Sequence, residues 1–226
     1  MQDYITIVYD EKIKPYTKYP FQLCWYLFNR FNMKKGDKLL DVGCGRGDFS
    51  KGFKDLGLEV FCLDKDKICS GIRKELLRGI ELQYADVEKD AFPYENERFD
   101  FVFSKSLIEH LSKPDNFTKE SYRVLKKGGR KIIMTPDWQS QRCIFFNDYT
   151  HVRPYMVNGL ADLLKIYNFK SVQAELFYQL PVLWKYPQLK IFSRFLQLFG
   201  PPQKIYKNKF FRWSRELMIL GTGIKK

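Results

Sequence analysis

The sequence predicts an α/β fold with a doubly wound, seven-stranded sheet that is mostly parallel and has an antiparallel last strand. Short apolar runs alternate with segments whose apolar residues recur at helical spacing, which favours βαβ units with helices on both faces of a sheet. The 226 residues are 45% hydrophobic, enough for one substantial core. We therefore expect a single domain over 1–226, made of a helical cover (1–35), a core (36–135) and a region of loops, lid helices and last strands (136–226).

The elements of the first half follow one another without a linker. Residues 21–31 place apolar side chains at helical spacing, which predicts a helix lying over the domain. Lys38–Val42 predicts the first strand, and the helix that follows it stops at Gly57. The pattern continues with a strand at Val60–Leu63, a helix at 66–78 that ends at Gly79, and a third strand at Ile80–Ala85.

The second half repeats the alternation and then loosens. It predicts a fourth strand at Phe99–Phe103, helices at Ser106–Leu111 and Pro114–Leu125, a stop at Gly128-Gly129 and a fifth strand at Lys131–Met134. Residues 137–153 show no clear period, which indicates a loop above the strand ends. Beyond them the sequence predicts a helix at 160–167, a sixth strand at Lys170–Leu176, an inserted helix at 189–199 and a seventh strand at Leu217–Gly221.

The run from Leu39 to Gly47 carries the strongest local motif, a strand followed by Gly43, Gly45 and Gly47 and then by a helix. Such a loop lets backbone amides approach a ligand near a helix N-terminus. Dinucleotide-binding sites share it, so a nicotinamide-dependent oxidoreductase is one alternative. The spacing is G-x-G-x-G, however, and Asp41 lies in the strand itself. Its carboxylate would repel a pyrophosphate but would suit an ammonium or sulfonium group.

Two further aspartates end the next two strands. Asp64 closes the second strand, where a carboxylate commonly accepts hydrogen bonds from ribose hydroxyls. Asp86 closes the third strand. Because these strand ends share one edge of the sheet, Asp41, Asp64 and Asp86 could hold an adenosine and an amino acid in one cleft. Each aspartate also has a structural interpretation, as a cap or turn residue.

Together these motifs resemble the class I S-adenosyl-L-methionine (SAM)-dependent methyltransferases, in particular their small-molecule, ubiquinone-biosynthesis-like group. The resemblance covers roughly residues 20–175 and includes Leu39–Phe53, Ala85–Val87, Phe99–Leu111 and Arg123–Gly129. It implies a Rossmann-like fold, methyltransferase activity and SAM as cofactor. By that similarity, Asp41, Gly43, Cys44, Gly45 and Gly47 face the methionine moiety, Asp64 and Lys65 the ribose, Asp86 and the Val87 amide the adenine, and Ser104 the sulfonium.

Two histidines, His110 and His151, are candidates for a catalytic base. A sugar or alcohol hydroxyl is a poor nucleophile until a base removes its proton. His151 lies in a polar, aromatic loop just beyond the fifth strand, where the acceptor would sit, and Asp148 is close enough in sequence to orient its ring. His110 is the second candidate. Either histidine could instead make a structural, loop-anchoring hydrogen bond.

The motifs after the fourth strand narrow the choice of methyl acceptor. That position reads Ser104-Lys105-Ser106 and lacks the Asn/Asp-Pro-Pro-aromatic motif typical of enzymes that methylate nucleobase amino groups. The chain also lacks the Pro-Cys nucleophile typical of enzymes that methylate carbon 5 of pyrimidines. The sequence thus gives no strong nucleic-acid signal. We expect O-methylation of a sugar or other small molecule in glycan or secondary metabolism. RNA or protein methylation and a catalytically silent SAM-binding module are the alternatives.

The cysteines do not form a metal-binding or disulfide pattern. Five are present, at positions 24, 44, 62, 69 and 143, and none belongs to a C-x-x-C pair. This argues against a disulfide framework, a zinc knuckle and an iron–sulfur cluster. The sequence therefore predicts no metal site.

The basic charge lies mainly in the C-terminal segment. Of a net charge of +13, most comes from Val182–Lys226, which contains ten Lys or Arg and a single acid, Glu216. Residues 183–207 are aromatic as well as basic, and they could form a lid, an interfacial helix on anionic lipid suited to a lipid-linked sugar acceptor, or ordinary core with solvated lysines. No apolar run is long enough to span a membrane, and the first residues do not resemble a secretory signal. We expect a cytoplasmic protein, peripheral to the inner face of the membrane if the segment binds lipid.

Overall fold

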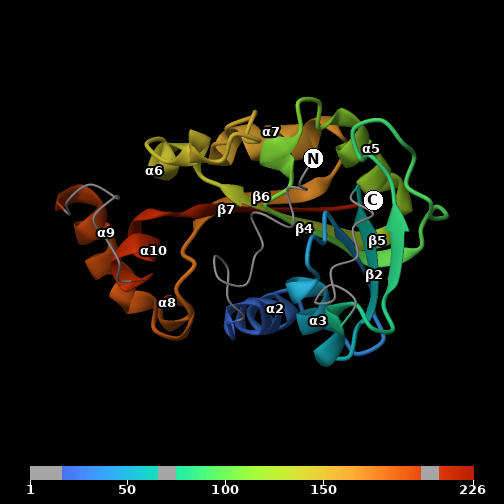
Figure 1. The fold of residues 1–226 in the computed structure, drawn as a ribbon, viewed down its shortest axis with the longest axis horizontal. Coiled ribbons are helices and arrows are strands. Elements are labelled where there is room, and N and C mark those ends of the chain that lie inside the picture. The colour runs from blue at the N-terminus through green and yellow to red at the C-terminus, as the bar shows by residue number, and fades with distance from the viewer. Residues whose placement is uncertain (1–16, 66–74, 200–208) are drawn as a thin grey trace.

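The computed structural model describes residues 17–65, 75–199 and 209–226, and it confirms the expected α/β fold (Figure 1). Seven strands form one sheet in the order β3-β2-β1-β4-β5-β7-β6. The last strand, β7, pairs antiparallel with both β5 and β6, whereas β1 to β5 pair parallel with one another. The strands are β1 (Lys38–Val42), β2 (Glu59–Asp64), β3 (Glu81–Tyr84), β4 (Phe99–Lys105), β5 (Leu125–Pro136), β6 (Lys170–Phe177) and β7 (Met218–Ile224).

Helices cover both faces of the sheet (Figure 1). On one face lie α2 (Tyr19–Arg30) and α3 (Asp48–Asp55), and on the other lie α5 (Asp115–Val124) and α7 (Val157–Ile166). Leu39 and Leu40 of β1 are both fully buried, but they belong to the cores on opposite faces because side chains alternate along a strand. This two-sided burial explains why the central strands read as continuous apolar runs.

Two segments differ in kind from the sequence prediction, whereas other element ends shift by a few residues. The helix expected over Ser106–Leu111 is only a single 3-10 turn, η1 (Ile108–His110), because Ser106 adopts a positive φ of 55° that interrupts helical geometry. The fifth strand begins at Leu125 and continues through Gly128-Gly129, which we expected to be a stop. A Cβ on Gly129 would lie 3.1 Å from the carbonyl oxygen of Asp100, so this glycine permits close approach to β4.

The segments outside the central sheet contain more helix than expected. The loop after β5 includes α6 (Trp138–Gln141) and the 3-10 turn η2 (Phe145–Asn147). The insertion between β6 and β7 projects from one end of the sheet (Figure 1) and contains α8 (Pro181–Lys185), η3 (Pro187–Leu189), α9 (Lys190–Phe199) and α10 (Lys209–Arg215). No helix in the described residues has the length and apolar character needed to cross a membrane. Most of the helix expected at 66–78, including Cys69, lies outside the described residues.

Candidate functional site

The glycine loop after β1 has the backbone geometry that its sequence requires. Gly43, Gly45 and Gly47 have φ values of 72°, 55° and 95°, in the left-handed region that disfavours residues with a side chain. A Cβ on Gly43 would also lie 2.8 Å from Cδ1 of Leu107, in the segment that follows β4. The loop can therefore pass close to the end of β4 before α3 begins at Asp48.

Asp41 lies in β1 with only 2% of its surface exposed. Its Oδ2 accepts a hydrogen bond of 2.6 Å from the hydroxyl of Ser50 in α3. Burial raises the pKa of Asp41 to about 7, and the Ser50 hydrogen bond partly opposes this shift. Asp41 thus ties the strand to the helix on either side of the glycine loop.

Asp64, at the end of β2, contacts the glycine loop directly. Its Oδ2 accepts a 2.7 Å hydrogen bond from the Gly45 amide and lies 3.7 Å from the Cys44 sulfur. The carboxylate is 7% exposed. The structure thereby brings together residues that are about twenty positions apart, as the arrangement of dinucleotide-type folds predicts.

Asp86 lies just beyond β3 and is part of a small charged group. Its carboxylate accepts a hydrogen bond of 3.1 Å from the Glu88 amide and lies 3.6 Å from the ammonium of Lys65. Partial burial acts to raise the pKa of Asp86, but the Glu88 amide and the neighbouring lysines outweigh it and lower the pKa. Val87 is buried and its carbonyl accepts a hydrogen bond of 3.0 Å from Asn116.

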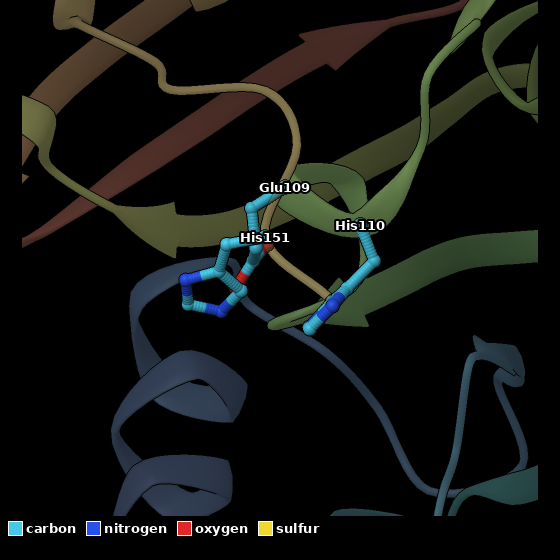
Figure 2. A group of neighbouring side chains, drawn as sticks. All are labelled: Glu109, His110 and His151. Atoms are coloured by element: carbon cyan, nitrogen blue, oxygen red, sulfur yellow. The ribbon is translucent and has the colours of Figure 1, made fainter. Parts of the chain in front are cut away.

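A second group of polar side chains lies where β4 and β5 end. The loop that carries His151 is tied to η1, because the Glu109 carbonyl accepts hydrogen bonds from the amides of Val152 and Arg153 at 2.9 and 3.0 Å. The rings of His110 and His151 are consequently 4.7 Å apart between centroids. Figure 2 shows Glu109, His110 and His151 converging from these two segments.

The ring of His151 bonds a backbone carbonyl through one nitrogen and has Asp148, the residue that we expected to orient it, near the other. Its Nδ1 lies 2.7 Å from the carbonyl oxygen of Phe145, which can only accept, so Nδ1 carries the proton and Nε2 the lone pair. The Asp148 carboxylate lies 4.0 Å from Nε2, and its Oδ1 accepts a hydrogen bond of 2.6 Å from Thr150. The short 3-10 turn η2 brings Phe145 within reach of the ring, which the sequence pattern did not reveal.

Three buried side-chain oxygens in the described part of the chain lack a hydrogen-bond partner. They are Ser104 Oγ, Glu109 Oε1 and the hydroxyl of Tyr155. Ser104 is the second-last residue of β4, and Glu109 follows that strand in η1. Tyr155 forms a β-bridge with Asp137, just beyond β5. Buried polar atoms are normally satisfied, and unsatisfied ones often mark places where a ligand binds. All three lie at or beyond the carboxyl ends of the parallel strands, where the glycine loop also lies.

Known proteins with related sequences decide the family. A model described as a methyltransferase domain matches residues 40–133. A ubiquinone biosynthesis O-methyltransferase from Pseudomonas entomophila is 30% identical over 103 residues, which cover 44% of this chain and 44% of that relative. Phosphoethanolamine N-methyltransferase 2 from Caenorhabditis elegans is 27% identical over 176 residues, covering 74% of this chain and 38% of that relative.

The matched region, residues 40–133, is a methyltransferase domain of the class I SAM-dependent type. The matched part of the chain spans less than half the length of these two curated relatives. Solved structures agree on the fold: a SAM-dependent methyltransferase from Archaeoglobus fulgidus matches with a TM-score of 0.67 and 18% identity, covering 99% of this chain and 100% of that chain. The glycine loop alone was compatible with a nicotinamide-dependent oxidoreductase or a methyltransferase. The match to the methyltransferase domain favours the second.

The residues of this methyltransferase fit SAM, the cofactor of its family. Asp41, a buried acid, adjoins a loop whose three glycines have positive φ. Asp64 presents a second carboxylate to that loop. Ser104 adds a buried oxygen without a partner at the end of the neighbouring strand. These carboxylate and hydroxyl oxygens can accept hydrogen bonds from an ammonium group and from ribose hydroxyls.

Sequence reasoning missed several residues of the methyltransferase site. Ser50 and Glu109 were not singled out. Ser50 donates a hydrogen bond to Asp41, and the Glu109 carbonyl accepts hydrogen bonds from the amides of the two residues that follow His151. Tyr155 was treated only as part of the loop that contains His151. A signal for Glu109 was available in the sequence, because an acid beside His110 is unusual in a buried, apolar segment.

Proposed function

We propose that this methyltransferase transfers the methyl group of SAM to a hydroxyl oxygen of a small molecule, such as a sugar. One observation carries the proposal: His151, with a lone pair on Nε2, and three buried oxygens without a partner all lie at or beyond the carboxyl ends of the parallel strands, where the glycine loop also lies. When bound, SAM supplies a methyl group activated by a sulfonium. The other requirements of the reaction fall to residues of the chain.

The cofactor is held, in this proposal, by Asp41, Gly43, Cys44, Gly45 and Gly47 at its methionine end. Asp64 and Lys65 bind its ribose, and Asp86 with the Val87 amide binds its adenine. Asp41 provides charge complementarity to an ammonium group, and its burial makes that attraction stronger than in water. The buried hydroxyl of Ser104 lines the floor near the sulfonium.

His151 is the proposed base for the acceptor hydroxyl, with His110 and Asp148 beside it. The hydrogen bond from Nδ1 to Phe145 fixes the tautomer in which Nε2 can accept a proton. General-base catalysis of this kind contributes about 10²–10⁴-fold to a rate. The rest of the acceleration comes from holding the acceptor oxygen in line with the methyl group.

A small-molecule acceptor is supported by the names of the relatives. One relative is named for phosphoethanolamine and another for ubiquinone biosynthesis, so related chains act on nitrogen as well as on oxygen. The test library should therefore contain sugars, other alcohols, phenols and phosphorylated amines. RNA and a protein extract serve as the remaining candidate acceptors.

Calorimetric titration tests the proposed cofactor first. We expect S-adenosylhomocysteine (SAH) to bind one per chain with micromolar or tighter affinity and NAD not to bind, because Asp41 and the loop spacing oppose a pyrophosphate. SAM is then incubated with the chain and each candidate acceptor, and the SAH formed is measured. Formation of SAH with a hydroxyl compound supports the proposal. Binding of SAH without methylation of any acceptor would instead identify a SAM-binding module.

We further propose that α9 contacts an anionic membrane surface, which would suit a lipid-linked acceptor. Four apolar side chains on one face of this helix are exposed: Ile191 (71%), Phe192 (63%), Phe195 (60%) and Phe199 (72%). The opposite face carries Ser193, which is fully buried. Lys190 and Arg194 flank the apolar face. An exposed aromatic face with basic neighbours is typical of helices that lie in a lipid interface.

Flotation with lipid vesicles tests this contact. The chain is expected to float with vesicles containing phosphatidylserine and much less with neutral vesicles. A Phe192→Ser, Phe195→Ser double variant should lose more than tenfold of that binding, because each phenyl ring contributes roughly 1.5–3 kcal/mol on burial. Ile166→Ser, at a site 72% exposed on α7, is the matched control and should float like the wild type. Equal flotation of all three proteins would contradict the membrane contact.

A further inference from the structure

Glu109, His110 and His151 form a compact set of potential metal ligands on the acceptor side of the site. Each offers one ligand atom, and these three atoms lie within 4.8 Å of one another (Figure 2). Two atoms bound to one ion at about 2.1 Å are at most about 4.2 Å apart. A bound ion would therefore draw these side chains together by less than about 1 Å, which side-chain rotation can provide.

Both histidines are oriented as metal-binding histidines usually are. Nδ1 of His151 donates to the carbonyl of Phe145 at 2.7 Å. Nδ1 of His110 lies 2.8 Å from Thr150 Oγ1, whose own proton is donated to Asp148, so His110 must also donate from Nδ1. In each ring Nε2 thus carries the lone pair. Ligating imidazoles are fixed in this way by a hydrogen bond from the other ring nitrogen.

Glu109 supplies an independent indication that this group binds a cation. The side chain is fully buried, and its Oε2 accepts a hydrogen bond of 3.0 Å from Thr135. Its Oε1 has no hydrogen-bond partner among the described residues. A buried carboxylate with an unsatisfied oxygen is stabilised by a cation placed against it.

We propose that Glu109, His110 and His151 bind a divalent transition-metal ion, such as zinc or cobalt, at the acceptor side of the methyltransferase. Two imidazoles and one carboxylate suit these borderline ions better than magnesium or calcium, which prefer oxygen ligands alone. Three protein ligands leave coordination positions for a substrate atom, as in catalytic rather than structural sites.

The ion would change how the acceptor is activated, and this consequence rests on the proposed function. A hydroxyl bound to a divalent ion has a lowered pKa and can lose its proton to solvent near neutral pH. His151 would then serve as a ligand, and the proton would not pass to its Nε2. The methyl group would still move from sulfur to the acceptor oxygen, which leaves a neutral thioether and an ether.

Titration with Co²⁺ tests the site directly, with visible absorbance as the readout and a chain that carries no polyhistidine tag. We expect one Co²⁺ to bind per chain and Zn²⁺ to displace it. Glu109→Gln, which keeps the shape and the Thr135 hydrogen bond, and His151→Ala should each weaken binding at least tenfold. Thr150→Val removes the hydroxyl that bonds His110 and Asp148 but no proposed ligand, and it should weaken Co²⁺ binding about 10–100-fold.

Thr118→Val is the control for removal of a threonine hydroxyl, since the Thr118 hydroxyl lies in α5 and donates to the Pro114 carbonyl, away from the proposed ligands. It should bind Co²⁺ like the wild type. The same samples are titrated with SAH: normal SAH binding without saturable Co²⁺ binding would overturn the metal site and leave the proposed function intact. Co²⁺ binding that is equal in all variants would overturn it as well. Loss of SAH binding with intact Co²⁺ binding would count against the proposed function alone.

Discussion

Replacing Asp64 by alanine is expected to raise the dissociation constant for SAH at least 100-fold. The carboxylate can accept two hydrogen bonds from the ribose, and each bond to a charged group contributes roughly 1.5–3 kcal/mol. Asp64 also accepts the Gly45 amide at 2.7 Å, so the substitution removes a partner that fixes the glycine loop. Isothermal titration of the purified variant with SAH measures the effect.

Two further variants make this result specific. Asp64→Asn keeps the shape of the side chain but loses its charge, and its affinity should fall between those of the wild type and Asp64→Ala. Asp100→Ala removes an aspartate at the opposite end of the strands, where it pairs with Lys126 at 2.8 Å. Its dissociation constant for SAH should stay within about twofold of the wild-type value. Such a change is small, because a tenfold change corresponds to about 1.4 kcal/mol. Wild-type affinity in a folded Asp64→Ala protein would show that the ribose is bound elsewhere.

Replacing Phe103 by alanine is expected to lower the free energy of unfolding by about 3–5 kcal/mol. Phe103 is fully buried in β4, and its ring lies 5.2 Å from that of Phe53 and 6.0 Å from that of Phe49, both in α3. The substitution therefore leaves a cavity between the central strand and the helix that follows the glycine loop. Because Phe103 lies opposite Asp41 in the parallel register, SAH binding should weaken too. Urea unfolding followed by circular dichroism measures the loss of stability.

The control for this prediction is an exposed ring. Phe192→Ala removes a phenyl group that is 63% exposed, and its unfolding free energy should stay within about 0.5 kcal/mol of the wild type. Phe103→Leu should give an intermediate value, because it fills part of the cavity. Similar values for Phe103→Ala and Phe192→Ala would mean that Phe103 does not support the core as its burial indicates.

Local sequence patterns were sufficient for the central strands and for the glycine loop. The central strands are apolar on both faces, so their runs are visible without any tertiary information. The glycines of the loop need positive φ, which few other residues tolerate, and this restricts the sequence at fixed positions. The patterns were less reliable at Ser106–Leu111, where one positive φ reduces an expected helix to a 3-10 turn. They also failed at Gly128-Gly129, where glycines serve close strand packing instead of ending an element.

The fold class and the resemblance to methyltransferases could be predicted from sequence alone, because both depend on short-range periodicity and on motifs within about fifteen residues. Which side chains gather beyond β4 and β5 depends instead on long-range contacts. His151 meets Glu109 and His110 because amides of the following residues, Val152 and Arg153, donate to the Glu109 carbonyl. The orientation of its ring depends equally on the turn that presents the Phe145 carbonyl. Contacts of this kind join segments some forty residues apart through single hydrogen bonds, and no local periodicity records them.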